Sequence, residues 1–214
     1  MLSKPLGAPL YVSNGPGTLN SVGIVFNVLP NLGPNLQISA LNVTGQDMAW
    51  DAARARLYVT GTGSAETNGS SIVVVDTAAS MVVNAVYAGS QPSSVGLSDD
   101  GHYLYAGFQS LSAMRHVTLA DLALDLTIPI QSSSACLSYA TDVKAAPGHP
   151  ETFAVTMGNR AISPPDDGGI AVFDNAIQRT QPEPPISGKH YKIAWGKDAT
   201  RFYTNTAFGG TTIG

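Results

Sequence analysis

Short apolar stretches alternate with glycine-rich and polar stretches along this chain, and one apolar pattern recurs. Leu57-Tyr58-Val59-Thr60 is β-branched and aromatic and stops at Gly61, which is typical of a β-strand that runs into a turn. Related segments stand at 10–14, 57–61, 104–107, 153–156 and 202–205. Their second residues are at positions 11, 58, 105, 154 and 203, so the spacings are 47, 47, 49 and 49 residues. This near-constant spacing predicts a repeat architecture.

Three further short segments belong to each repeat. The segment after the motif is found at 21–28, 70–77, 113–120 and 168–175. The next is found at 36–41, 82–89, 123–130 and, in degraded form, 181–186. The last, before the following motif, is found at 47–52, 93–98, 141–146 and 191–196. Four short strands per unit, without helical periodicity, predict four-stranded antiparallel β-propeller blades. The last segment is the innermost strand a, the motif is strand b, and the two segments that follow the motif are strands c and d.

The repeat resembles a known family. "LYVSN", "LYVTG", "SSIVVVDTAASMVVNAV" and "QPSSVGLSDDGHYLYAG" are similar to the YVTN-type, WD40-like β-propeller repeat of bacterial proteins. The resemblance spans residues 10 to about 205 and is strongest at 44–108, whereas Ala154 replaces the motif tyrosine and 162–169 lengthens a loop. It implies a propeller fold in a secreted, periplasmic or cell-surface protein. Such propellers include binding scaffolds, lactonase-like enzymes and parts of redox proteins, so the fold does not select a function.

The strand tally predicts one propeller segment over residues 1–214, with about four blades in an incomplete or open ring. The chain is expected to open on strands b, c and d, to continue with three full blades, and to close on strands a and b. An open arc exposes two blade faces, so self-association is a further expectation.

Composition excludes several classes of partner. Charged residues make up 12% of the chain, the net charge is −4, and no run of Lys or Arg offers a nucleic-acid surface. No stretch reaches 18 uninterrupted apolar residues, so no membrane span is predicted. Cys136 is the single cysteine, which excludes an internal disulfide, and we interpret it as a buried apolar residue. The first ten residues lack the apolar core of a signal peptide, although an extracellular or periplasmic location is expected from the resemblance.

The histidines and carboxylates are the candidate metal ligands of the chain. His102 and His149 fall in predicted a–b turns, whereas His116 and His190 fall in or beside strands elsewhere in a blade, so the four are not expected to converge. Asp47 and Asp142 lie on or beside a strands and Glu66 lies in a b–c loop, where a lactonase-like propeller would hold a hard cation. Turn or strand-end roles are the preferred interpretation of these acids. No cofactor, metal site or catalytic residue is therefore assigned.

The glycine-rich segment and most of the aromatic residues are predicted to have structural roles. "GTGSAETNG" (61–69) lacks the third glycine of a dinucleotide fingerprint and is predicted to be a b–c loop. The recurring tyrosines at positions 11, 58, 105 and 203 are predicted to pack between blades. Trp50 and Trp195 lie on a strands, where they either pack between blades or bracket the channel mouth.

The function predicted from these observations is a binding or scaffold module. Recognition is expected on the face formed by b–c loops 14–20, 61–69, 108–112 and 157–168 and by d–a loops 42–46, 89–92, 131–140 and 187–190. The ligand there is a protein, a small molecule or a carbohydrate. The alternative is part of a lactonase-like or quinoprotein-like propeller enzyme, which a cation on the channel axis beside Asp47 or Asp142 would favour.

Overall fold

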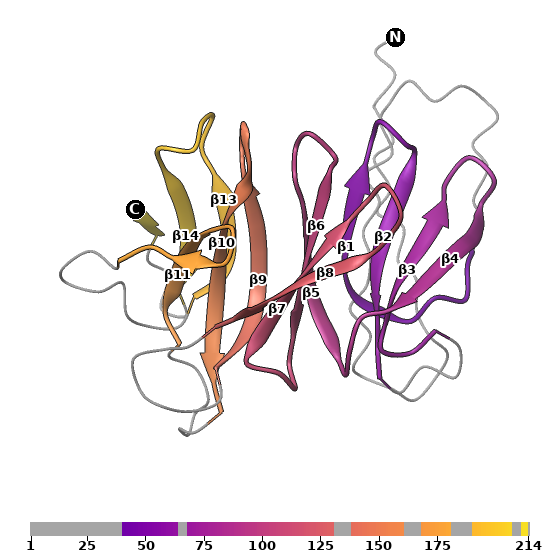
Figure 1. The fold of residues 1–214 in the computed structure, drawn as a ribbon, viewed down its shortest axis with the longest axis horizontal. Helices are drawn as coiled ribbons and strands as arrows, with labels where there is room; N and C mark the ends of the chain where they lie inside the picture. Colours follow the sequence, from indigo (N-terminus) through magenta and orange to yellow (C-terminus); the bar gives the residue numbers. More distant parts are fainter. Residues whose placement is uncertain are drawn as a thin grey trace, which may run out of the picture. The chain divides into compact units, whose positions relative to one another are not determined.

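The chain divides into two units, Met1–Ala40 and Leu41–Gly214, and every strand in the structure belongs to the second unit. The structure is a computed structural model that describes residues 40–63, 68–130, 138–160, 168–180, 190–206 and 211–213. All regular secondary structure in these residues is β-strand (Figure 1).

Four antiparallel sheets, which we number blade 1 to blade 4, follow one another along the unit (Figure 1). Blade 1 consists of β1 (Gly45–Asp51), β2 (Arg56–Gly61), β3 (Ser71–Asp76) and β4 (Met81–Tyr87). Blade 2 consists of β5 (Pro92–Leu97), β6 (Tyr103–Phe108), β7 (Ala113–Thr118) and β8 (Leu124–Pro129). Blade 3 consists of β9 (Ser138–Ala146), β10 (His149–Asn159), β11 (Ile170–Asp174) and β12 (Ile177–Gln178). Blade 4 consists of β13 (His190–Trp195), β14 (Phe202–Thr206) and β15 (Thr211–Ile213).

The repeat interpretation of the sequence is confirmed wherever the structure describes the residues. The motif segments at 57–60, 104–107, 153–156 and 202–205 lie on the second strands of the four blades. The segment predicted as strand a before each motif forms the first strand of the same blade. The motif at 10–14, the segment 21–28 and most of 36–41 lie outside the described residues, as does 181–186. A single propeller segment over 1–214 therefore stays a prediction.

Two strand predictions are corrected. The outermost strand of blade 3 is β12, which begins before the segment at 181–186. Asn175 has a φ of +54° and Asp174 pairs with Ile177, so a two-residue turn returns the chain at once. Blade 4 does not close on strand b, because β14 pairs with β15 over Tyr203↔Ile213 to Asn205↔Thr211. A segment of three β-branched residues was too short to recognise as a strand from sequence.

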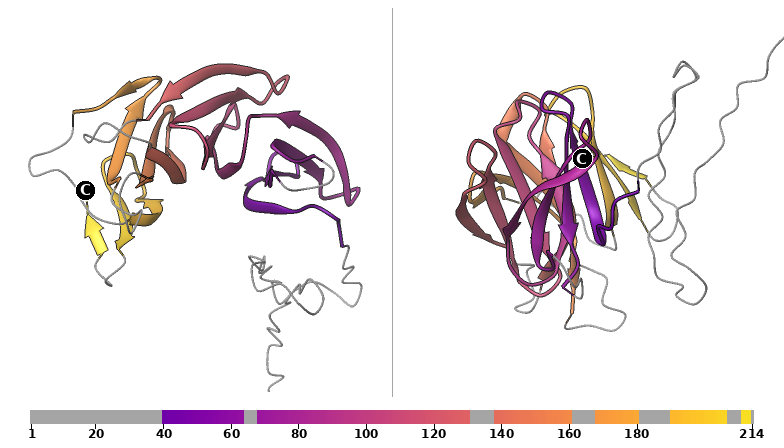
Figure 2. Two further views of the ribbon diagram at one scale, coloured as in Figure 1. Left: turned by 90° about the horizontal axis from the view of Figure 1, so that it is seen from below. Right: turned by 90° about the vertical axis from the view of Figure 1, so that its right-hand side faces the viewer.

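Each ladder of backbone hydrogen bonds in the described residues stays within one blade. The pairing joins β1 to β4, β5 to β8, β9 to β12 and β13 to β15, and blades 1 and 4 share no ladder in that part of the chain. Strand pairing therefore does not close a ring in the described residues, and the successive blades are separate sheets (Figure 2). Contacts other than strand pairing must hold each blade to the next.

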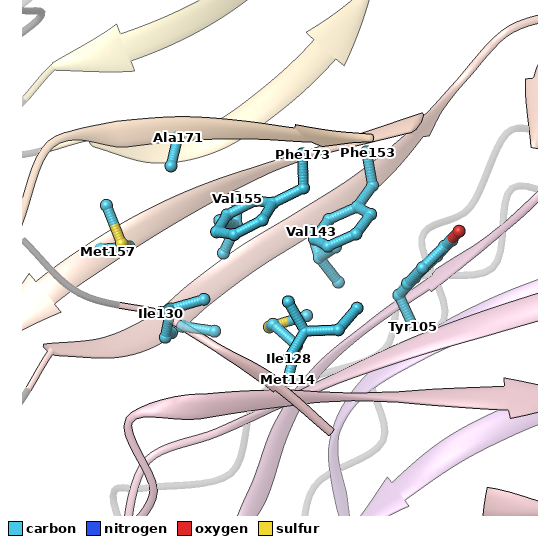
Figure 3. Close-up of a cluster of buried hydrophobic side chains, with 11 residues drawn as sticks. Tyr105, Met114, Ile128, Ile130, Val143, Phe153, Val155, Met157, Ala171 and Phe173 are labelled. Atoms are coloured by element: carbon cyan, nitrogen blue, oxygen red, sulfur yellow. The ribbon is translucent and has the colours of Figure 1, made fainter. Parts of the chain in front are cut away.

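An apolar cluster joins blades 2 and 3, as Figure 3 shows. The ring of Tyr105 lies 4.4 Å, centroid to centroid, from the ring of Phe153, which stacks on Phe173 at 5.1 Å. Met114 and Ile128 of blade 2 are fully buried in the same cluster. Aromatic pairs at these separations stabilise the contact beyond the burial of their area.

The residue at the motif position contacts the following blade. Tyr58 of blade 1 is buried in a cluster with Leu104 and Ala106 of blade 2, and Tyr105 contacts Phe153 of blade 3. Ala154 occupies the position in blade 3 and is buried beside residues of blade 4. These contacts place Tyr58 and Tyr105 between blades, as the sequence predicted.

Tyr203 departs from that expectation. Its side chain belongs to blade 4 and is 37% exposed, and no described blade follows it. Tyr11 lies outside the described residues.

Truncation of the Tyr105 hydroxyl tests the blade contact. The hydroxyl donates a hydrogen bond to the carbonyl oxygen of Pro150 at 2.7 Å, so Tyr105→Phe leaves a carbonyl of blade 3 without its partner. We expect the free energy of unfolding to fall by about 1 kcal/mol, against less than about 0.5 kcal/mol for Tyr203→Phe. Chemical denaturation of both variants measures this, and equal losses would contradict the assigned contact.

The Tyr105 phenol is also expected to make the free energy of unfolding depend on pH. Burial, aided by the charge of Glu151, raises the pKa of Tyr105 above its ordinary value. The folded state thus favours the neutral phenol, so its contribution to stability is complete below the unfolded pKa of about 10 and is lost as pH rises beyond it. Unfolding free energies measured at pH 8 and pH 11 should differ less for Tyr105→Phe than for the wild type.

Candidate functional site

Four residues occupy the same position on the innermost strands of the four blades. The ladders pair Met48 with Val59, Val95 with Ala106, Val143 with Val155 and Ile193 with Thr204. The residue just before each first-named partner is equivalent in the four blades. These residues are Asp47, Ser94, Asp142 and Lys192.

Asp47 and Asp142 bind the backbone of the following blade. The Oδ2 atom of Asp47 accepts a hydrogen bond from the N–H of Val95 at 3.0 Å. The Oδ2 atom of Asp142 accepts one from the N–H of Ile193 at 2.8 Å. A buried backbone N–H needs such a partner, so each carboxylate cross-links two blades. The preferred interpretation as turn or strand-end residues is therefore wrong for both, because the side chains lie within their strands.

The contact between blades 2 and 3 uses small residues in place of a carboxylate. A Cβ atom added to Gly96 would lie 2.7 Å from the carbonyl oxygen of Val143, which is closer than real Cβ contacts allow. One added to Gly107 would lie 2.4 Å from the Cβ of Ala140. Ser93 Oγ donates to the carbonyl oxygen of Ala140 at 3.2 Å. At this step the innermost strands approach too closely for an intervening aspartate.

The carboxylates are arranged for structural cross-linking. Asp142 is fully buried, and its Oδ1 atom accepts hydrogen bonds from Lys144 Nζ at 3.2 Å and Lys192 Nζ at 3.5 Å. Asp47 reaches blade 2 and Asp142 reaches blade 4, so the two do not converge. Within the described ranges, no group of three or more His, Cys, Asp or Glu residues could hold a metal ion. Glu66 lies outside those ranges.

The four histidines have different surroundings. His102 is exposed and His116 is largely buried, and each ring contacts a carboxylate of its own blade. His190 is the first residue of β13, and its ring lies 3.3 Å from a threonine hydroxyl on β14. His149 is exposed at the start of β10.

The two tryptophans have different surroundings. Trp195 donates its indole N–H to the carbonyl oxygen of Lys144 at 2.9 Å, which is a contact between blades 4 and 3. Its ring also meets Phe202 edge-on at 5.4 Å. Trp50 is half exposed. Packing between blades is therefore the correct alternative for Trp195.

A hollow of about 440 Å³ opens on the loop face between blades 2 and 3. Its lining residues are Gln91, Gln109, Ser110, Tyr139 and Arg160. They come from the predicted loop segments 89–92, 108–112, 131–140 and 157–168, although Tyr139 lies on β9. The predicted loop segments therefore contribute to the lining of the hollow, whereas the individual lining residues were not predicted because no short motif marks them.

Backbone and hydroxyl contacts hold the blade 2 side of the hollow. Gln91 has a φ of +54°, in the left-handed region, and its carbonyl oxygen accepts a hydrogen bond from the N–H of Gln109 at 3.0 Å. Ser110 Oγ donates to the carbonyl oxygen of Ser90 at 2.5 Å. These contacts tie the d–a loop to the b–c loop and set the side chains of Gln91 and Gln109 at the opening.

A tyrosine and an arginine form the blade 3 side. Tyr139 on β9 pairs with Gly158 on β10, and a Cβ atom at Gly158 would overlap the Tyr139 ring. The missing side chain therefore lets the ring lie across the neighbouring strand. The guanidinium carbon of Arg160 lies 5.0 Å from the centroid of that ring, which is a cation–π distance.

Removal of the Asp142 carboxylate tests its cross-linking role. Asp142→Ala leaves the Ile193 N–H without its acceptor, so we expect a loss of about 1–3 kcal/mol in unfolding free energy. Asp142→Asn keeps an oxygen at this position and should lose less. The control is Asp198→Ala, because the hydrogen bonds of Asp198 go to the exposed Thr200 two residues away, and this change should alter stability by under about 0.5 kcal/mol. Equal losses for Asp142→Ala and this control would refute the cross-link.

No family model and no curated protein matches the chain in sequence. In the described residues, no helix is long and apolar enough to cross a membrane.

Solved structures resemble the chain in fold. The hydrazine synthase of Kuenenia stuttgartiensis matches with a TM-score of 0.62 at 14% identity, over 85% of this chain and 48% of that one. The Cps50 (Swd1) β-propeller domain of Myceliophteria thermophila matches with a TM-score of 0.61 at 12% identity, over 83% and 54%. Dihydro-heme d1 dehydrogenase NirN, solved in complex with DHE, matches with a TM-score of 0.59 at 15% identity, over 78% and 33%.

The chain spans between a third and about half of the length of these structures. At such low identities the likeness shows the fold alone. The antiparallel blades and these similarities together establish the described part of the chain as β-propeller blades in an arrangement that is not closed.

Proposed function

We propose that this chain is the binding module of a bacterial secreted or cell-surface protein, and that it takes its ligand in the hollow between blades 2 and 3. The observation that carries the proposal is the composition of this hollow. Loops of two blades contribute amide, hydroxyl, aromatic and guanidinium groups to one opening of about 440 Å³. Small-molecule sites have volumes of about 300–1,000 Å³ and use a few converging polar groups.

The scaffold beneath the hollow suits this role. Blades 2 and 3 share the cluster of Tyr105, Phe153 and Phe173, and their innermost strands approach closely at Gly96. A rigid support keeps the lining side chains in place before a ligand arrives, which reduces the entropic cost of binding. Recognition by loops on a rigid scaffold is the usual arrangement in such folds.

The secreted or surface setting rests on the similarity of the "LYVTG" repeat to the YVTN type. Membership of that repeat family and association between copies of the chain are parts of the same proposal. An enzymatic role gains no support from Asp47 and Asp142, because both carboxylates cross-link blades.

A blocked variant tests the proposal. Gln109→Trp places a large side chain at the opening, and Gln178→Trp makes the same replacement at an exposed position on β12. Both variants and the wild type are titrated with one panel of neutral saccharides, acidic saccharides, amino acids and short peptides by calorimetry. We expect at least one compound to bind the wild type and Gln178→Trp equally, and Gln109→Trp at least tenfold more weakly.

The opposite result is equally clear. If both variants keep the wild-type unfolding midpoint and no compound in the panel discriminates between them, the hollow is not the binding site and the proposal is wrong.

A further inference from the structure

Among the described residues that line the hollow between blades 2 and 3, Arg160 is the charged one. Arg160 is exposed at the edge of the hollow, and the other lining residues are two glutamines, a serine and a tyrosine. Other arginines contact carboxylates of their own blades: Arg54 with Asp51, Arg56 with Asp76, and Arg179 with Asp174. Arg160 instead lies over an aromatic ring, and no carboxylate of the described residues forms an ion pair with it. The described residues therefore give the opening a positive charge.

The guanidinium group of Arg160 is held in place by its neighbours. It lies 5.0 Å from the centroid of the Tyr139 ring, and that ring lies across Gly158 on the paired strand. A cation–π contact limits the freedom of the arginine, and its N–H donors form a planar fork. Such a fork matches the two oxygens of a carboxylate, and little entropy is lost when the bond forms.

The blade 2 side offers groups that complement hydroxyls. The carboxamide groups of Gln91 and Gln109 each provide hydrogen-bond donors and an acceptor. A sugar hydroxyl also donates and accepts, so it can pair with either part of a carboxamide. Ser110 Oγ donates to the carbonyl oxygen of Ser90, so its lone pairs can accept from a ligand. The hollow therefore combines a carboxylate-matching fork on blade 3 with hydroxyl-matching groups on blade 2.

We infer that the ligand is an acidic saccharide, with the carboxylate of a uronate unit bound by Arg160 and its hydroxyls bound by Gln91, Gln109 and Ser110. The inference rests on the proposed function, since it names the ligand class of the same hollow. Tyr139 is a positioning residue that orients Arg160. The other described residues that line the hollow are uncharged, so recognition of hydroxyls and recognition of the carboxylate make separable contributions to affinity.

Matched saccharides and variants of Arg160 test the inference. The probes are a glucuronate-containing disaccharide and the same disaccharide with glucose in place of glucuronate, titrated by calorimetry at low and at physiological salt. Arg160→Gln should weaken binding of the acidic probe by about tenfold to a hundredfold and leave the neutral probe nearly unchanged. Arg160→Lys should fall in between, because an ammonium lacks the planar fork. Arg201→Gln, which alters an exposed arginine that does not line the hollow, is the control.

Variants of Tyr139 test the positioning role. Tyr139→Leu removes the ring beneath Arg160 and should weaken the acidic probe selectively, whereas Tyr139→Phe keeps the ring and should restore most of the affinity. Gly158→Ala displaces the ring and should resemble Tyr139→Leu. A role of Tyr139 in stability alone would weaken both probes together, so the difference between probes separates the two roles. Unfolding midpoints identify any variant that does not fold.

Several results would overturn the inference and leave the proposed function standing. Equal affinity for both disaccharides, insensitivity of the acidic probe to Arg160→Gln, or equally tight binding of inorganic phosphate would each contradict a uronate site. Another compound whose binding is blocked by Gln109→Trp, with neither disaccharide bound, would contradict a saccharide site. If Gln109→Trp blocks nothing, the proposed function fails together with the inference.

Discussion

A four-stranded sheet has two faces and too few residues to cover either, and this constraint governs the rest of the structure. Each blade must bury its apolar faces against its neighbours, so the contact between consecutive blades is the interaction on which the fold depends. The aromatic residues at the blade 2 and blade 3 contact show how this is met. Tyr105 reaches across to Phe153, and Phe153 stacks on Phe173 within its own blade. Rigid placement of neighbouring loops is a consequence of this packing.

The innermost strands of neighbouring blades are joined in two different ways. Carboxylates of Asp47 and Asp142 join blades 1 and 2 and blades 3 and 4 through backbone N–H groups of the next strand. Between blades 2 and 3, glycines at 96 and 107 let the backbones approach directly. Residues that resemble metal ligands in sequence therefore act as hydrogen-bond acceptors, because each carboxylate meets a backbone N–H group of the next blade that needs a partner. The hollow with Arg160 opens at the loop face of the closely packed contact.

Much of the fold was predictable from sequence. The motif around Tyr58 and its copies placed the second strand of all four blades, since β-branched and aromatic residues followed by glycine turns form strands locally. Two strands, β12 and β15, were not predicted because they are too short to show a strand pattern. The turn at Asn175 leads into β12 after two residues, and β15 comprises three residues. The loop segments that line the hollow were also predictable, because loops follow from strand order.

The sequence by itself determined the blade repeat, the alternation of strands and turns, and the segments that supply the loop face, because these depend on residues that are neighbours in the chain. Tertiary structure alone decided which side chains meet across blades. Asp142 and Ile193 lie 51 residues apart, and their hydrogen bond requires two blades to pack in one relative position. The same holds for Gln91 and Arg160, which line one hollow only because blades 2 and 3 share a core. Local patterns specify strands, and contacts between distant strands assemble the site.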